Sequence, residues 1–249
     1  MGASGSGKTS IKKVVFEKLS PYESVFNTPT NKIESFTNEQ MGFVKITVTE
    51  YPGSFSPEKA SPEDLKYFET CGMLIYVFDV QDHNANYSPF DDFKEKVVPQ
   101  LNKYPDMQCA IFIHKSDSVN MKQGEFRKQK GEIQKRFRDI LVESNSKTSP
   151  TFYGTSIYDY TLFETFSKIF QKMIYQNDQL SVLLDELSRK CTFEKAYLFD
   201  VFNKIYLAID SSPMEAQTYE ICSDMIDVVL DMSGIYGEEN NNESLLKLS

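Results

Sequence analysis

Apolar positions along residues 1–177 alternate between short continuous runs and longer amphipathic segments. The runs Met73–Phe78 and Cys109–Ile113 are typical of strands buried on both faces of a sheet, and Phe152-Tyr153 indicates another. Gly42–Val48 alternates as a half-buried strand does. Helical periodicity covers Ile11–Leu19, Phe90–Asn102, Gly124–Val142 and Thr161–Tyr175. Strands alternating with helices predict a doubly wound α/β domain, in which ligands bind at loops beyond the carboxyl ends of the strands.

The pattern changes after residue 177. A helix is predicted over Leu180–Arg189, and the apolar runs Ala196–Val201 and Ile205–Ile209 predict an antiparallel hairpin with a turn at 202–204. A hairpin does not continue the alternation of parallel strands and helices, so a second, smaller α/β domain begins here. The expected boundaries are 1–177 and 178–249.

A second helix is predicted downstream of the hairpin. Ser212-Pro213-Met214-Glu215 combines a capping box with proline at the first helical position. One apolar stripe follows, made of Ile221, Cys222, Met225, Ile226 and Val229. A stripe of this kind forms either the core of its own domain or a contact with a partner. On the stripe alone the intradomain core is favoured, whereas the small predicted sheet, whose edge and apolar face need cover, indicates a partner.

Composition excludes several classes of function. The 249 residues carry a net charge of −9, so no positive field is available for nucleic acid. No apolar run approaches the roughly 20 residues of a membrane-spanning helix, and no signal peptide precedes the first motif, so direct membrane insertion is not expected. The two histidines, His83 and His114, are too few for a zinc site. Scattered thiols indicate a reducing, cytoplasmic location: Cys71, Cys109, Cys191 and Cys222.

The first residues fit a phosphate-binding loop. Gly2-Ala3-Ser4-Gly5-Ser6-Gly7-Lys8-Thr9 matches G-x-x-x-x-G-K-[ST] and leads into the helix predicted from Ser10. In this motif backbone N–H groups surround the phosphates, the lysine reaches the β and γ oxygens, and the hydroxyl of Thr9 is placed to bind Mg²⁺. The strand that should feed the loop is expected upstream of Met1. The predicted phosphate contacts are Gly2, Ser4, Gly5, Ser6, Gly7, Lys8, Thr9 and Ser10.

A second motif follows the predicted strand Cys109–Ile113. His114-Lys115-Ser116-Asp117 stands where Ras-like GTPases carry [NT]-K-x-D. A carboxylate at Asp117 accepts from N1–H and the exocyclic amine of guanine, whereas adenine has no proton at N1. The stem of Lys115 would cover the ring. A surface turn with ordinary charges is the alternative, and the phosphate loop upstream weighs against it.

The loop after the next strand is a weaker signal. Thr155-Ser156-Ile157 takes the place of the segment whose backbone N–H groups contact guanine O6. Ser156 and Ile157 are therefore predicted base contacts. The same cluster also reads as an ordinary helix cap, as Asp159 and Thr161 suggest.

Two loops are candidates for the switches that sense the γ-phosphate. Glu50-Tyr51-Pro52-Gly53 takes the position of D-x-x-G, with glutamate at the metal-supporting acid. Ser54 stands where hydrolytic members of the superfamily place the glutamine that orients water. Thr30, rather than Thr28, is predicted to close onto Mg²⁺. The predicted hydrolytic residues are thus Lys8, Thr30, Gly53 and Ser54, and the predicted metal ligands are Thr9, Thr30 and Glu50.

Longer stretches extend the likeness beyond motifs, and they cover Lys13–Ser20, Thr30–Ile33, Ile113–Asp117, Thr155–Asp159, Glu194–Asp200, Asp210–Pro213 and Met225–Val229. These stretches resemble the Rag family of GTPases, on its C/D side. The resemblance implies a Ras-like P-loop GTPase domain followed by a partial roadblock, or longin-like, dimerisation domain. It also implies a heterodimer with an A/B-type Rag subunit, a scaffold complex at the lysosomal or vacuolar membrane, and amino-acid signalling to the TOR kinase complex.

The sequence departs from that family at Glu50, at Ser54 and at both ends. More strands and a helix are expected beyond Leu248, so the sequence is expected to be truncated. Two functions remain open: a GTP/GDP-binding signalling subunit with slow hydrolysis, and a pseudo-GTPase scaffold with little turnover. A P-loop ATPase or small-molecule kinase is disfavoured by Asp117 and by the lack of a lid-like arginine cluster.

Overall fold

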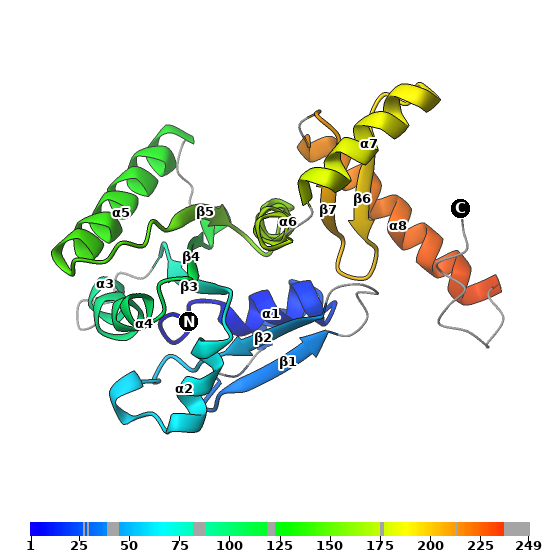
Figure 1. Cartoon of the computed structure of the whole chain (residues 1–249). Helices are drawn as coiled ribbons and strands as arrows, with labels where there is room; N and C mark the ends of the chain where they lie inside the picture. Colours follow the sequence, from blue (N-terminus) through cyan, green and yellow to red (C-terminus); the bar gives the residue numbers. More distant parts are fainter. Residues whose placement is uncertain are drawn as a thin grey trace. The chain divides into compact units, whose positions relative to one another are not determined.

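The structure of the chain is a computed structural model that describes residues 1–26, 28, 30–38, 45–81, 88–118, 123–174, 177–212 and 214–236. It consists of two compact units, Met1–Thr165 and Phe166–Ser249. The division falls within helix α6 (Thr161–Met173), N-terminal to the boundary expected after residue 177 (Figure 1).

A parallel sheet forms the centre of the first unit. Its order is β3-β4-β5, with bounds Met73–Asp79, Gln108–His114 and Thr151–Thr155. The register pairs Asp79 with His114 and His114 with Thr155, so three polar residues lie side by side where the strands end. The predicted parallel α/β arrangement is confirmed, and its carboxyl edge carries polar side chains.

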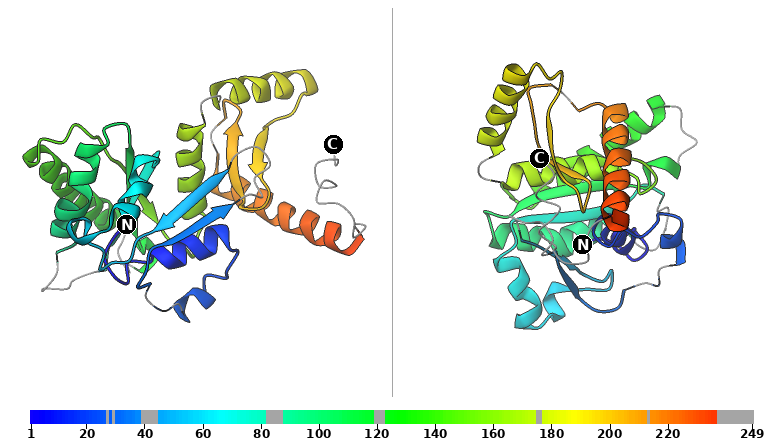
Figure 2. Two further views of the ribbon diagram at one scale, coloured as in Figure 1. Left: turned by 60° about the horizontal axis from the view of Figure 1, so that its bottom comes forward. Right: turned by 90° about the vertical axis from the view of Figure 1, so that its right-hand side faces the viewer.

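A separate hairpin precedes this sheet. β1 (Glu34–Asn38) pairs antiparallel with β2 (Ile46–Glu50), and α1 (Lys8–Phe16) lies alongside β2 (Figure 2). The sequence predicted β2 but not β1, because β1 is short and mostly polar. Residues 42–44 of the predicted strand lie outside the described residues.

The predicted helix Phe90–Asn102 is continuous but irregular. It consists of α3 (Pro89–Asp92), a π-helical turn (Phe93–Val97) and α4 (Val98–Lys103). Pro99 has no N–H to donate to the carbonyl four residues earlier, so the helical ladder must be rearranged there. The π turn directly before the proline accommodates this break.

Two helices have sequence signals of different strength. α5 (Gln123–Glu143) follows its predicted range closely, whereas the sequence analysis missed α2 (Pro62–Glu69). α2 begins with a capping box: Ser61 Oγ accepts from Asp64 N (3.2 Å), and Asp64 Oδ2 accepts from Ser61 N (3.1 Å). The Ser-Pro-Glu-Asp sequence at 61–64 carried that signal.

Phe137 of α5 lies at the centre of the first unit's core and is fully buried. Its ring centroid lies between 4.8 and 6.0 Å from those of Tyr76, Phe78, Phe90 and Phe93. All four pairs are tilted or edge-to-face, and the edge-to-face arrangement is one that aromatic quadrupoles favour. The cluster joins β3 to the helices that cover it and fixes the strand ends relative to the loops.

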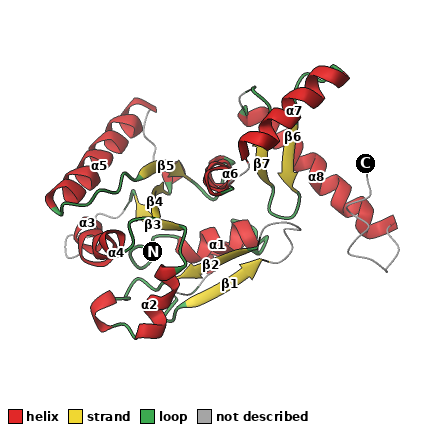
Figure 3. Cartoon of the chain, viewed as in Figure 1, coloured by secondary structure: helices red, strands yellow, loops and turns green. Residues whose placement is uncertain are grey.

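The second unit contains α7 (Asn177–Cys191), β6 (Tyr197–Asp200), β7 (Ile205–Ile209) and α8 (Ala216–Tyr236), drawn by type in Figure 3. The predicted hairpin is confirmed: β6 and β7 pair antiparallel, with an irregularity between Leu198 and Phe199. No helix in the described part of the chain is long and apolar enough to cross a membrane.

The predicted start of α8 was wrong. The helix begins at Ala216 and not at Pro213, a residue outside the described ones. Ser212 does not cap the helix, because both its N–H (2.8 Å) and its hydroxyl donate to Asp210 Oδ1. Asp210 also accepts from Ala196 N (2.7 Å), so the serine is held in the segment that follows β7, beside the start of β6.

Candidate functional site

The phosphate loop runs from Met1 into α1. Met1 pairs with β3: its amine donates to Ile75 O (2.7 Å) and its carbonyl accepts from Val77 N (2.9 Å). Gly7 ends the loop as the N-cap of α1, with φ +98° and no side-chain cap. A Cβ on Gly7 would lie 2.6 Å from the His114 ring, so only glycine fits there. The first amides of α1 are therefore available to an anion.

Lys8 folds back over this loop. Its Nζ donates to the carbonyls of Gly2 (2.8 Å) and Ala3 (2.6 Å). Burial lowers the pKa of Lys8 to about 8, and Glu50 opposes that shift. An added anion such as a phosphate would favour the charged form of this ammonium.

A cavity of about 430 Å³ opens in front of the loop, a volume suited to a small-molecule ligand. It lies within the first unit, and segments far apart in the sequence line it. The lining residues are Ser4, Gly5, Gly7, Lys8, Thr9, Ser10, Ser24, Thr28, Thr30, Glu50, Gly53, Gln81, His114, Lys115, Asp117, Ile157 and Tyr158.

Most predicted site residues line this cavity. Among the described residues, Gly2, Ser6, Ser54 and Ser156 were predicted but are not part of the lining. The sequence analysis missed Ser24, Gln81 and Tyr158. Tyr158 follows the predicted base-binding loop directly, so its position was readable from the sequence, whereas Ser24 and Gln81 lie outside any motif.

Three oxygen-bearing side chains meet on one side of the cavity. Thr9 Oγ1 donates to Glu50 Oε1, and Thr30 Oγ1 lies 3.3 Å from the same oxygen. The two hydroxyl oxygens are 2.8 Å apart. The structure thus brings together the predicted metal ligands, while Thr28 has no such contact among the described residues. Hydroxyl and carboxylate oxygens suit a hard cation such as Mg²⁺.

Asp117 also lines the cavity and lies in the turn after β4. Ser156 Oγ donates to its Oδ1 (2.5 Å) and so orients the carboxylate. Lys115 Nζ contacts Asp79 Oδ2 (2.5 Å) and donates to Gly5 O (3.0 Å), which ties this turn to β3 and to the phosphate loop. Ser156 thus orients the carboxylate of Asp117, while Lys115 holds the turn that carries it.

His114 lies against the phosphate loop and supports it. Its Nδ1 lies 3.0 Å from Thr155 Oγ1, and its ring packs against Gly7. Burial lowers the pKa of His114 to about 4, and the Lys115 charge acts in the same direction. The imidazole is thus neutral near pH 7 and links β4, β5 and the phosphate loop.

Comparison with known proteins decides the family. The family model described as "Gtr1/RagA G protein conserved region" matches residues 1–226. The chain belongs to the Gtr1/RagA family of G proteins.

Relatives within the Gtr1/RagA family differ in similarity. The chain is 41% identical over 238 residues to human (Homo sapiens) "Ras-related GTP-binding protein C", covering 95% of this chain and 59% of that protein. It is 38% identical over 242 residues to "GTP-binding protein gtr2" of Schizosaccharomyces pombe (96% and 75%). Identity to "GTP-binding protein gtr1" of the same yeast is 27% over 218 residues (87% and 68%). The resemblance to the C/D side is confirmed. The chain spans about three fifths of the length of Ras-related GTP-binding protein C.

The predicted switch loop Glu50–Gly53 of this Gtr1/RagA chain packs tightly against the phosphate loop. A Cβ on Gly53 would lie 2.3 Å from Ser4 N, so glycine is required for that approach. Lys96 Nζ donates to Gly53 O (2.8 Å) and pairs with Asp92 Oδ1 (2.5 Å). Ser54 is exposed. Sequence reasoning missed Lys96, because a lysine inside a helix carries no motif.

The loop predicted to contact guanine O6 is stabilised in part by hydrogen bonds between its own residues and the start of α6. Ser156 N donates to Thr161 Oγ1 (3.1 Å), and Thr161 N donates to Asp159 Oδ1 (2.9 Å). Asp159 thus accepts from the first N–H of α6, in line with the helix-cap interpretation. Ile157 remains in the cavity lining, whereas the N–H of Ser156 already has an acceptor.

Proposed function

We propose that this chain is a guanine-nucleotide-binding subunit of the Rag C/D type that hydrolyses GTP slowly. One observation carries the proposal: a single cavity is lined both by the phosphate loop and by Asp117. The backbone amides at the start of α1 would bind phosphate oxygens, with Lys8 reaching the β and γ positions. Asp117 would accept from N1–H and the exocyclic amine of guanine.

Thr9, Thr30 and Glu50 are the residues that would hold Mg²⁺ with the nucleotide. Their oxygens converge on one point of the cavity, and the donor set suits this ion. Bound Mg²⁺ supplies charge neutralisation for the phosphates. Gly53 lies beside the phosphate loop, where its backbone can respond to a γ-phosphate.

Nucleotide selectivity tests the proposal. Displacement of a fluorescent guanine nucleotide should need far more ATP than GTP or GDP, by up to roughly 10⁴-fold, because adenine would leave the Asp117 carboxylate unpaired. Asp117→Ala should remove the preference. Asp91→Ala, at an exposed aspartate of α3, is the matched control and should retain it. If ATP displaces the fluorescent nucleotide from the unmodified chain as well as GTP does, the proposal is wrong.

A pseudo-GTPase scaffold is the second candidate, and the position of Ser54 favours it. Ser54 is exposed, and its side chain is too short to orient water as a glutamine does. Single-turnover phosphate release separates the candidates. The slow-GTPase proposal expects a measurable rate below the roughly 10⁻⁴ s⁻¹ of intrinsic GTPases that carry the glutamine. Bound GTP that stays intact over days would establish the scaffold.

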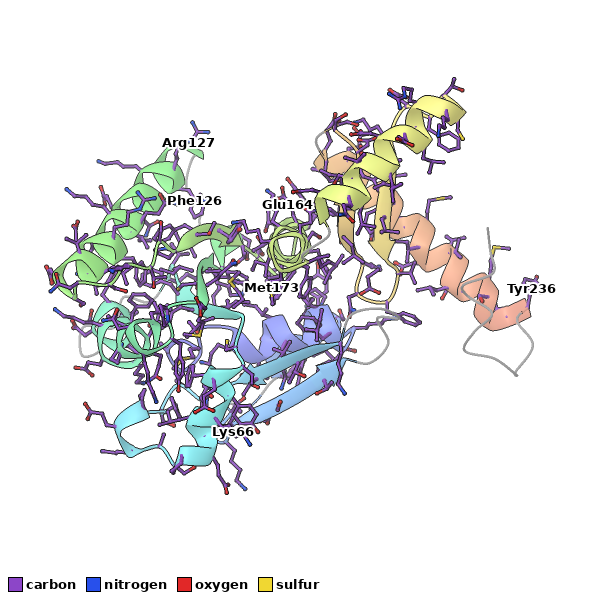
Figure 4. All side chains as sticks on the ribbon, viewed as in Figure 1. Lys66, Phe126, Arg127, Glu164, Met173 and Tyr236 are labelled. Carbon is purple, nitrogen blue, oxygen red and sulfur yellow. The ribbon has the colours of Figure 1, made fainter. Side chains whose placement is uncertain are left out.

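The second unit is proposed to be a roadblock-like dimerisation domain that pairs with an A/B-type Rag subunit. On α8, Ile221, Met225 and Val229 are exposed by 57, 61 and 45%. The buried anchor of the helix is Tyr219, whose hydroxyl donates to Lys204 O (2.9 Å). Apolar side chains continue to the end of the helix, where Figure 4 labels Tyr236. An exposed apolar stripe of this length is typical of a protein interface.

The cellular setting follows from the same family likeness. We propose that the heterodimer is cytoplasmic and is recruited through its partners, a scaffold complex among them, to the lysosomal or vacuolar surface. There its nucleotide state would signal amino-acid supply to the TOR kinase complex. The similarity to both Ras-related GTP-binding protein C and gtr2 supports this proposal.

A further inference from the structure

One buried cation near the nucleotide cavity belongs to none of the motifs. Lys12 lies on α1, three residues after Thr9, and is 6% exposed. Its Nζ lies 2.6 Å from Glu34 Oε2 and 3.2 Å from Glu50 Oε2. Glu34 and Glu50 are directly opposite one another in the β1–β2 register. Two carboxylates in that position repel each other, so the ammonium between them joins the hairpin to α1.

The two oxygens of Glu50 therefore face different partners. Oε1 contacts the hydroxyls of Thr9 and Thr30, on the cavity side. Oε2 is buried and lies against the Lys12 ammonium. Burial alone would lower the pKa of Lys12, but its contacts with Glu34 and Glu50 raise it above the ordinary value. The Lys12 ammonium thus lies between carboxylates from the two strands of the hairpin.

We propose that Lys12 is a positioning residue and built-in counter-ion for Glu50, and that it lowers the dependence of nucleotide binding on Mg²⁺. The ion pair turns Oε2 away from the metal side, so that Glu50 offers Oε1 alone. It also cancels much of the carboxylate charge that would otherwise attract the cation. This inference rests on the proposed nucleotide binding and names a feature of that same site.

The test compares GDP affinity in Mg²⁺ and in EDTA, using displacement of a fluorescent nucleotide from the full chain. Lys12→Met should raise the ratio of the two dissociation constants by roughly tenfold over the unmodified chain, since the Glu50 charge then acts on Mg²⁺ alone. Lys12→Arg, which keeps the charge, should restore the original ratio. Lys13→Met removes the neighbouring lysine of α1 and should leave the ratio unchanged.

A double-mutant cycle shows whether Lys12 acts through Glu50. In a Glu50→Gln background, Lys12→Met should change the Mg²⁺ ratio less than about twofold. If Lys12→Met does not fold, Lys12→Gln combined with Glu34→Gln leaves the buried Glu50 carboxylate without a second carboxylate opposite it and should show the same steeper Mg²⁺ dependence.

The outcomes separate this inference from the proposed function. Should the unmodified chain bind GDP while Lys12→Met leaves the Mg²⁺ ratio unchanged, the counter-ion role is wrong. An equal rise in the Glu50→Gln background overturns it as well, because Lys12 would then act by another route. Failure of the unmodified chain to bind GDP in either buffer overturns the proposed function and this inference together.

Discussion

The two compact units use their apolar side chains in opposite ways. In the first, Phe137 and the rings around it are buried, and polar residues at the strand ends surround a cavity. In the second, Tyr219 anchors α8 while residues such as Met225 and Ile235 remain exposed. We therefore expect the first unit to act through the residues that line its cavity and the second through the exposed apolar side chains of α8. Substitutions at the two sets should therefore fail in different assays.

The largest effect is expected in the aromatic core. Phe137→Ala should lower the free energy of unfolding by about 3–5 kcal/mol, because it removes a fully buried ring and leaves a cavity. Val142→Ala, at an exposed position of the same helix, should change it by less than about 0.5 kcal/mol. Chemical denaturation followed by circular dichroism measures both. Equal effects would mean that Phe137 is not the centre of the core.

A pH-dependent effect of similar size is expected at His114. Its pKa is lowered to about 4 in the folded chain, from an ordinary value of 6.5, so protonation favours unfolding. The stabilisation by the neutral ring is complete above pH 6.5 and is lost as the pH falls toward 4. The loss over that window is about 3 kcal/mol, at 1.36 kcal/mol per pKa unit. His114→Asn cannot titrate, so its unfolding free energy should fall less over the same range. Parallel curves would contradict this account.

The smallest effect on stability is expected on α8, together with the clearest effect on assembly. Met225→Asp should change the free energy of unfolding of the isolated chain by less than about 1 kcal/mol, because the side chain is exposed. Co-expressed with an A/B-type Rag subunit, the same variant should lose the one-to-one complex on size exclusion. Glu220→Gln, an exposed polar position of the helix, should keep it. Deletion of residues 178–249 should also abolish the complex, and its persistence would place the interface in the first unit.

Sequence reasoning succeeded where a single local pattern, such as an apolar run or a motif, determines the element. Continuous apolar runs located β3 and β4, and the phosphate-loop motif preceded α1 as expected. It failed where short polar segments depend on their neighbours. β1 is stabilised by pairing with β2, and its own residues show no periodicity that would predict a strand.

The same distinction applies to the site. Motif spacing predicted Asp117 as a residue of the site and predicted that Thr9 and Glu50 lie close together. The motifs that contain these residues have fixed positions relative to the strand ends and the phosphate loop. Lys12 and Lys96 were missed, because an ion pair between distant elements depends on tertiary contacts that no local pattern encodes. Pro99 in the helix Phe90–Asn102 indicates an irregularity in that helix. Only the structure shows that the irregularity is a π turn.

The most direct test of guanine recognition exchanges the hydrogen-bonding groups at Asp117. Xanthine carries a carbonyl where guanine has its exocyclic amine, so an amide that accepts from N1–H can also donate to this carbonyl. The account predicts that the unmodified chain prefers GDP to XDP, and that Asp117→Asn reverses this preference by roughly 10²-fold or more. The dissociation constants of both nucleotides for both chains give the answer. A preference for GDP that Asp117→Asn leaves unchanged would show that another residue reads the base, and would contradict the assignment of the cavity.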